Sequence, residues 1–239
     1  MTTTSLPHGI SLQGSPVSKV ILIVAAHTDD EALGCGGTIA RHVAEGDTVH
    51  AVFIADGVSS RAGADPADLQ RRQAAAAQAH AVLGIQKVVY LGLPDNRLDS
   101  LPLLDVVQPL EAIIRELSPE VIYTHHYGDL NVDHRITNTA VMTACRPVPG
   151  HKVREIYQFE VMSSTEWAAP GQAPFTPSLY VDISRYLQKK INALLAYRLE
   201  MHSSPHSRSL QNIEFLARHR GMTVGYEAAE AFIVTRLLR

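Results

Sequence analysis

Short apolar runs rich in β-branched residues alternate with longer segments of helical period along the first part of the chain. We predict strands at residues 19–25, 48–55, 87–91 and 121–124, and helices at residues 32–45, 66–83 and 103–117. Short apolar runs of this kind are typical of strands that are covered on both faces. The alternation therefore predicts βαβ units, that is, an α/β three-layer sandwich around a mainly parallel sheet.

The ends of the second predicted helix carry recognisable signals. Asp65 and Pro66 stand in the order expected of an N-cap and the first helical residue, and Gly84 is suited to the C-terminal cap. These residues support a helix over 66–83.

The sequence changes character after Cys145, where Pro147, Pro149 and Gly150 end a helix that begins near Asp133. The expected elements beyond this point are strands near 155–161 and 179–181, helices at 184–201 and 207–220, and a closing segment at 228–238. No linker-like composition separates them from the rest. We therefore expect one domain over residues 1–239, with residues 1–18 as an N-terminal extension and residues 146–239 as a C-terminal extension of the same domain.

Composition limits the classes of protein. The chain has 239 residues, 46% of them hydrophobic, which suffices for one sizeable core. The net charge of −3 and the lack of a basic run argue against a nucleic-acid partner. No apolar run is long enough for a membrane span. The two cysteines, Cys35 and Cys145, form no disulfide framework, so we expect a cytoplasmic protein with small, partly buried thiols.

The stretch AAHTDDEALGCGG, residues 25–37, follows the first predicted strand. Ligands of open α/β sheets bind just past the carboxyl ends of strands, so this position favours a site. The three acids Asp29, Asp30 and Glu31 exceed what a helix N-terminus needs, and helix capping does not explain His27.

A dinucleotide fingerprint is the first alternative for this stretch, because Gly34, Gly36 and Gly37 follow a strand. The spacing departs from GxGxxG, since Ile39 occupies the place of the last glycine. The carboxylates of residues 29–31 would also repel a pyrophosphate at the helix N-terminus. We therefore expect no nucleotide cofactor.

A divalent metal offsets the crowded negative charge. His27 and Asp30 are suitable zinc ligands, and Asp29 beside them can act as a base toward water activated by the metal. A catalytic zinc site needs a third ligand, and His134, after the fourth strand, is the candidate. Asp133 either orients a ligand imidazole or caps the helix.

The motifs AHTDDE and GDLNVDHR together resemble the paired signature, AHPDDE and HPDH in its usual form, of the LmbE-like/PIG-L family of zinc-dependent N-acetylglucosaminyl deacetylases. The segments LGLPD at 91–95, RG at 220–221, VG at 224–225 and AEAF at 229–232 are also similar to this family. The resemblance implies a Rossmann-like fold, a small N-acetylated amino sugar or its conjugate as substrate, and possible homo-oligomers.

Carried onto this sequence, the family pattern makes His27, Asp30 and His134 the ligands of one Zn²⁺ per chain, or of another divalent transition metal. Asp29 becomes the general base. In the family's reaction, water attacks an acetamide carbonyl that the metal polarises, and acetate leaves a freed amine.

Two residues depart from the usual motifs. Thr28 replaces a proline, and Asn131 replaces the first histidine of HPDH. Asn131 can donate a hydrogen bond to an oxyanion, but it cannot transfer a proton. The general acid then becomes His126 or His206, although a histidine in the loop around 206 is equally consistent with simple exposure.

Substrate contacts are expected from the loops after the second and third strands. Arg61, Asp95 and Asn96 have side chains suited to sugar hydroxyls, or they are ordinary turn residues. Tyr127 either stacks on a sugar ring or packs on its own loop. The expected function is a zinc-dependent N-acetyl amino-sugar deacetylase. An amidase that cleaves a larger acyl group from a sugar or thiol conjugate, and a non-catalytic metal or sugar binder, are the alternatives.

Overall fold

The computed structural model describes residues 18–60, 63 and 65–239. Residues 1–17 of the expected N-terminal extension, and Arg61, lie outside these described residues. Within the described part, one seven-stranded sheet has the order β3-β2-β1-β4-β5-β7-β6. Its strands are β1 (Val20–Ala25), β2 (Thr48–Ala55), β3 (Lys87–Leu93), β4 (Val121–His125), β5 (Glu155–Phe159), β6 (Leu179–Asp182) and β7 (Ala229–Leu237).

The sheet is mixed. The neighbouring strands from β3 through β5 all pair in parallel, as the βαβ pattern predicts. Strand β7 pairs antiparallel with β5, and β6 pairs antiparallel with β7. The prediction of a mainly parallel sheet therefore holds for the first five strands only, because the C-terminal extension adds two antiparallel ones.

The predicted helices are all present: α2 and α3 have the predicted bounds, and the ends of the others are shifted. The described residues form α1 (Asp30–Ala44), α2 (Pro66–Leu83), α3 (Leu103–Leu117), α4 (Val132–Ala144), α5 (Leu187–Ala196) and α6 (Leu210–Met222), with 3-10 turns η1 (Leu98–Ser100) and η2 (Thr165–Trp167). Asp65 forms a capping box at the start of α2, and Gly84 ends that helix with a left-handed φ of 88°. Helix α5 is shorter than the predicted 184–201, because the chain turns after Ala196.

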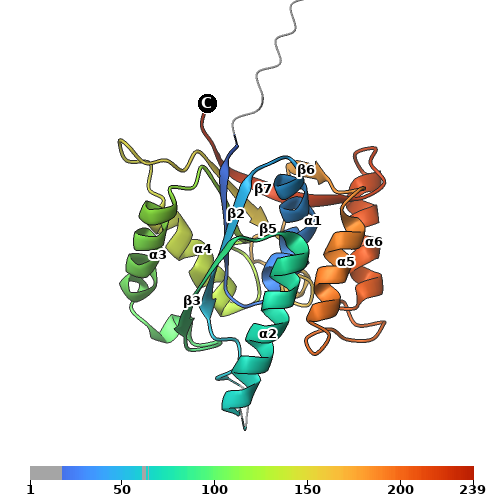
Figure 1. Ribbon diagram of the computed structural model, residues 1–239, viewed down its shortest axis with the longest axis horizontal. Helices are drawn as coiled ribbons and strands as arrows, with labels where there is room; N and C mark the ends of the chain where they lie inside the picture. Colours follow the sequence, from blue (N-terminus) through green and yellow to red (C-terminus); the bar gives the residue numbers. More distant parts are fainter. Residues whose placement is uncertain (1–17, 61–62, 64) are drawn as a thin grey trace, which may run out of the picture.

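The helices form two layers on the sheet (Figure 1). Helices α1, α2, α5 and α6 cover one face, and α3 and α4 cover the other. Strand β1 is buried on both faces: Ile21 and Ile23 contribute to one core, and Leu22 and Val24 to the other. No helix in the described part of the chain is long and apolar enough to cross a membrane.

The strand order creates a switch point at the centre of the sheet. From β1 the chain proceeds outward to β2 and β3, and it then returns to place β4 on the other side of β1. The loops that follow β1 and β4 therefore leave the same edge in opposite directions, which opens a crevice between them. Both histidine- and aspartate-rich motifs lie on these two loops.

Helix α1 is broken after its first turn. Cys35 has non-helical dihedral angles, with φ of −144°. A Cβ added at Gly34 would collide with the Phe159 ring, and one added at Gly37 would come within 2.7 Å of Ile183. The glycines of GCGG thus allow α1 to approach the sheet closely, which explains them without a nucleotide.

A buried ion pair satisfies the backbone groups that this break leaves unpaired. Glu230 accepts the N–H groups of Gly37 and Thr38 at 2.9 and 2.6 Å. Lys190 donates to the Leu33 carbonyl at 2.7 Å and to Glu230 at 2.6 Å. Each charge replaces helical hydrogen bonds, so the pair holds the first turn of α1, which carries Asp30, in place.

Replacing Lys190 with alanine should destabilise the protein strongly. Lys190 and Glu230 are each only 4% exposed, so the substitution leaves a buried carboxylate without its cation. Breaking such a pair costs about 3–5 kcal/mol of unfolding free energy. Urea denaturation measures the change.

The matched control is Lys87→Ala, which removes the lysine of an exposed pair with Glu116. Its effect should stay within about 1 kcal/mol. Equal effects of the two substitutions would contradict a structural role for the Lys190–Glu230 pair.

Candidate metal centre

The site lies in the crevice at the carboxyl edge of the sheet. The loop after β1 contributes His27, Asp29 and Asp30, and the segment after β4 contributes Asp129, Asn131, Asp133 and His134. Asp95 and Asn96 reach the same region from the loop after β3. The sequence motifs, which are about a hundred residues apart, therefore meet in space.

The three predicted metal ligands converge on one carboxylate oxygen. Asp30 Oδ2 lies 3.3 Å from His27 Nδ1 and 3.4 Å from His134 Nε2. One ligand atom from each residue lies within 4.8 Å of the others, and all three residues are buried. This set has the donor types that zinc and related divalent metals prefer.

The remaining nitrogen of each imidazole faces a carboxylate. His27 Nε2 lies 3.0 Å from Asp95 Oδ1 and 3.1 Å from Asp133 Oδ2. His134 Nδ1 lies 3.1 Å from Asp129 Oδ1. Metal-binding histidines commonly donate their second N–H to a carboxylate, which fixes the ring and its tautomer. The arrangement therefore fits two imidazoles prepared as metal ligands.

The carboxylates around the two rings make the site strongly negative. Burial opposes a charged imidazole, yet Asp30 and Asp129 raise the pKa of His134 to about 9. The pKa of Asp30 is held well below its usual range, because the charges of His134 and His125 outweigh the effect of burial. A divalent cation would supply the missing positive charge, so the residues present fit a metal.

Two other clusters of possible metal ligands have fewer free donor atoms. The second cluster is His27, Asp95 and Asp133, and the third is His42, Glu45 and Asp47. Asp133, which also faces His27 in the second cluster, accepts the backbone N–H groups of Asn96 at 2.7 Å and Leu98 at 3.1 Å. The third cluster lies around His42, whose ring nitrogens are already bonded to Asp47 at 2.7 Å and the Tyr123 hydroxyl at 2.9 Å. The His27–Asp30–His134 set is therefore the better metal site.

Asp29 lies beside this set in a strained conformation. Its φ of 109° is unusual for a residue with a side chain. Glu31 Oε2 accepts the Asp29 N–H at 2.9 Å, and the Asp29 carbonyl accepts the N–H of Leu33 at 2.9 Å. These bonds hold the backbone of Asp29 in its strained conformation.

Two arginines hold the Asp29 carboxylate. Arg208 lies 3.1 Å from Oδ2, and Arg72 lies 3.4 Å from Oδ1. Burial raises the pKa of Asp29 to about 6, although both arginines oppose the shift. The carboxylate therefore has an environment unlike that of a surface aspartate.

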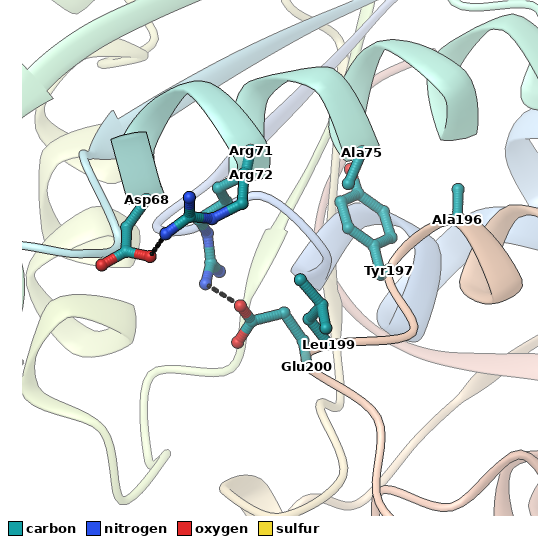
Figure 2. A pocket seen from close by; sticks show the side chains of 8 residues that line it. All are labelled: Asp68, Arg71, Arg72, Ala75, Ala196, Tyr197, Leu199 and Glu200. Carbon is teal, nitrogen blue, oxygen red and sulfur yellow. Dashed lines mark hydrogen bonds and ion pairs between the residues drawn. The ribbon is translucent and has the colours of Figure 1, made fainter. Parts of the chain in front are cut away.

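Arg72 also explains how the chain tolerates Thr28. It projects from α2 and donates to Thr28 Oγ1 at 2.8 Å and to the Thr28 carbonyl at 2.6 Å. Its third nitrogen lies 3.0 Å from Glu200 in the turn after α5, beside a small cavity of about 50 Å³ (Figure 2). The threonine hydroxyl thus anchors the turn where the usual motif has proline.

Glu31, the third acid of the run, is structural. Besides the Asp29 N–H, its carboxylate accepts the Tyr197 hydroxyl at 2.6 Å and lies 3.3 Å from His80. It is fully buried. The run of acids therefore divides into a candidate base, a candidate ligand and a support for the backbone.

The alternatives for Asp133 are resolved by Asn131. Asn131 is the N-cap of α4, because its side chain accepts the Asp133 N–H at 2.8 Å. Its amide nitrogen also lies 3.3 Å from the Asn96 side chain. Asp133 is therefore free of the capping role and instead faces the His27 ring.

Among the predicted substrate contacts, Asp95 and Asn96 reach the site. The Ser60 hydroxyl donates to Asp95. Burial raises the pKa of Asp95, but hydrogen bonds from His27 and Ser60 outweigh it and lower the value to about 2. Tyr127 is about half exposed and lies edge-on to His126, with 4.8 Å between ring centroids.

The two histidines predicted as candidates for the general acid, His126 and His206, lie in different surroundings. His126 is buried, and its Nε2 lies 2.8 Å from the Ala173 carbonyl, while Nδ1 lies 3.4 Å from Gln158. No recorded contact among the described residues joins His126 to the metal-ligand set. His206 accepts the N–H of Arg208, the residue that holds Asp29, at 3.0 Å.

Sequence reasoning missed several partners of the site. Asp129 could have been predicted, because it lies in GDLNVDHR five residues before the candidate ligand His134. The sequence around Arg72 and Arg208 gives no indication that they contact the site. His125 was also missed: its Nε2 accepts the Ala26 N–H at 2.8 Å, and its ring stacks on His134 with 3.9 Å between centroids.

Comparison with known proteins identifies the family of the chain. Residues 22–145, more than half of the chain, match the family model described as GlcNAc-PI de-N-acetylase, PIG-L. The chain is 30% identical to the uncharacterized deacetylase YaiS of Escherichia coli, over 75% of this chain and 91% of YaiS. It is 28% identical to a 1D-myo-inositol 2-acetamido-2-deoxy-alpha-D-glucopyranoside deacetylase of Saccharomonospora viridis, over 80% and 89% of the two chains.

Another relative has a different named activity: a 4-oxalmesaconate hydratase of Pseudomonas putida is 26% identical over 81% of this chain and 79% of its own. The conserved protein TT1542 of Thermus thermophilus has a similar structure, with a TM-score of 0.73, 28% identity, and coverage of 92% of this chain and 95% of its own. The family match and the YaiS relationship agree with the resemblance read from the two motifs. The chain therefore belongs to the GlcNAc-PI de-N-acetylase (PIG-L) family.

Proposed function

We propose that this protein is a zinc-dependent hydrolase that removes the N-acetyl group from an N-acetylglucosamine-type amino sugar or its conjugate. The observation that carries the proposal is the convergence of His27, Asp30 and His134 within 4.8 Å in a buried crevice, with Asp29 beside them. Membership of a family named for de-N-acetylation supports the reaction type.

His27, Asp30 and His134 would hold the zinc. When bound there, zinc acts as a Lewis acid that polarises an amide carbonyl and lowers the pKa of water. Asp29 accepts the proton of the attacking water, and its environment suits this task, because burial raises its pKa to about 6. The carboxylates of Asp95 and Asp133 hold the orientation of the His27 ring, and that of Asp129 holds the orientation of the His134 ring.

The roles outside the ligand set follow from local contacts. Asn131, the N-cap of α4, can donate a hydrogen bond to the developing oxyanion. Asn96, on the neighbouring loop, is placed to bind a sugar hydroxyl. We assign the same kind of contact to Arg61, from its place in the sequence alone. Tyr127, which is half exposed, packs against His126 of its own loop.

His206 is the better candidate for the general acid. The Arg208 N–H occupies its Nδ1, so the neutral ring carries its proton on Nε2. His126, by contrast, is engaged by the Ala173 carbonyl. The acid that protonates the leaving amine therefore comes from the loop between α5 and α6.

Asp29→Asn should retain zinc and lose most turnover. The amide keeps the size of the side chain but accepts no proton, and loss of a general base costs about 10²–10⁴ in kcat. Metal analysis and acetate release from N-acetylglucosamine are measured on the same sample. Loss of metal in parallel with activity would show that Asp29 serves the metal site instead.

His134→Ala should reduce bound zinc from about one per chain to a trace, because two ligands do not hold the ion. Asp129→Asn should weaken zinc affinity by about 10–100-fold, through loss of the partner of His134. His42→Ala, in a cluster outside the site, is the control and should leave zinc unchanged. Full zinc content in His134→Ala would remove His134 from the ligand set.

His206→Ala should move the basic limb of the pH profile of kcat/KM, whereas His126→Ala should not. Desolvation and the nearby His202 and Arg208 lower the pKa of His206 below its usual value. An acid must be protonated to act, so activity supported by His206 is lost as pH rises through this lowered pKa. If neither substitution moves the limb, both candidates are wrong.

A further inference from the structure

Trp167 is the only tryptophan of the chain, and its side chain is 50% exposed. It ends the 3-10 turn η2, which follows β5. The indole meets the ring of His206 edge-on, with 5.6 Å between centroids, and His206 in turn lies 4.1 Å from the ring of His202. Two segments that are forty residues apart therefore build one partly exposed aromatic surface.

The turn that carries Trp167 is held rigidly. The Glu166 carboxylate accepts the N–H groups of Ser163 at 2.7 Å and Ser164 at 3.2 Å. Thr165 accepts the Val161 N–H at 2.8 Å and donates to Asp129 at 2.5 Å. These hydrogen bonds hold the backbone that carries the indole, so binding a ligand against Trp167 requires no ordering of this turn.

Two series of contacts connect this surface to the metal centre. The Ser164 hydroxyl donates to Asp129 and lies 3.5 Å from His134 Nδ1. On the other side, Arg208 donates its backbone N–H to His206 and its guanidinium to Asp29. The turn that carries Trp167 is therefore joined to Asp129 and His134, and the loop that carries His206 is joined to Asp29.

We propose that Trp167, with His206 at its edge, is the stacking surface for the apolar face of the substrate's pyranose ring. The inference rests on the proposed function and deepens it. An indole offers a large flat apolar surface, which suits the C–H face of a closed sugar ring, while polar side chains such as Asn96 bind the hydroxyl groups.

Tyr127 is the competing aromatic residue. It is exposed to a similar degree, but it packs on His126, whose ring contacts the Ala173 carbonyl rather than the metal centre. The turn of Trp167 binds Asp129, which faces His134, so Trp167 is the better placed of the two. A ring-closed sugar is accordingly the preferred substrate, ahead of open-chain N-acyl compounds.

Because Trp167 is the sole tryptophan, indole emission reports directly on this surface. The purified protein is titrated with N-acetylglucosamine and, separately, with N-acetylglucosaminitol, which keeps the acetamide and hydroxyl groups but has no ring. Emission is recorded immediately after mixing. The expected result is a saturable change with the closed sugar and a much weaker one with the open-chain compound.

Kinetics on variants give the second readout. Trp167→Ala should raise KM for N-acetylglucosamine about three- to tenfold with kcat nearly unchanged, and Trp167→Phe should restore most of the lost affinity. The matched control is Phe215→Ala, which removes an exposed aromatic side chain of α6 and should leave KM unchanged.

The outcomes separate this inference from the function on which it rests. Acetate release without an emission change, or with an unaltered KM in Trp167→Ala, overturns the stacking surface and leaves the deacetylase intact. A saturable, ring-dependent emission change without acetate release supports the surface and overturns the activity. Absence of both signals overturns both.

Discussion

Buried negative charge is the constraint on which the carboxyl edge of the sheet depends. Asp30, Asp129 and Asp133 are at most 1% exposed, and a carboxylate in such a position is stable only beside cations or hydrogen-bond donors. The imidazoles of His27 and His134 offset part of this negative charge, and His27 Nδ1 and His134 Nε2 face Asp30. A divalent cation bound by His27, Asp30 and His134 would complete the charge balance, so the electrostatics of this edge and the proposed chemistry would have the same origin.

The C-terminal extension completes this edge. Lys190 and Glu230 bridge the break in α1, Tyr197 holds Glu31, and Arg208 holds Asp29. The first turn of α1, which contains the candidate ligand Asp30, is thus fixed by side chains that lie more than 150 residues further along the chain. On the ground of these contacts we propose that residues 146–239 are part of the same domain as the two motifs.

The sequence allowed the central elements to be predicted because their signals are local. Strands β1, β2 and β4 are mostly buried, whereas β3 lies partly exposed at the edge of the sheet, and parallel strands place their carboxyl-end loops together. This reasoning found His27, Asp30 and His134. The antiparallel direction of β6 and β7 could not be predicted, because a short apolar run has the same sequence pattern in a parallel and in an antiparallel strand.

Partners chosen by tertiary contact were also beyond prediction. Arg72 and Arg208 look like solvated charges in the sequence, and only the fold brings them to Asp29. His126 illustrates the converse: it stands beside the ligand motif in sequence, but it lies just after the end of β4, and its ring contacts Gln158 and the Ala173 carbonyl. Closeness in sequence was therefore a poor guide there.

The most direct test of the account is the metal content of the purified protein, measured together with acetate release from N-acetylglucosamine conjugates with and without a chelator. The panel includes derivatives with longer acyl groups, to compare acetate with larger leaving acids. The account predicts about one zinc per chain and acetate release that the chelator abolishes and added zinc restores. A protein that binds no metal, or that releases acetate equally well after complete removal of its metal, would contradict the central claim.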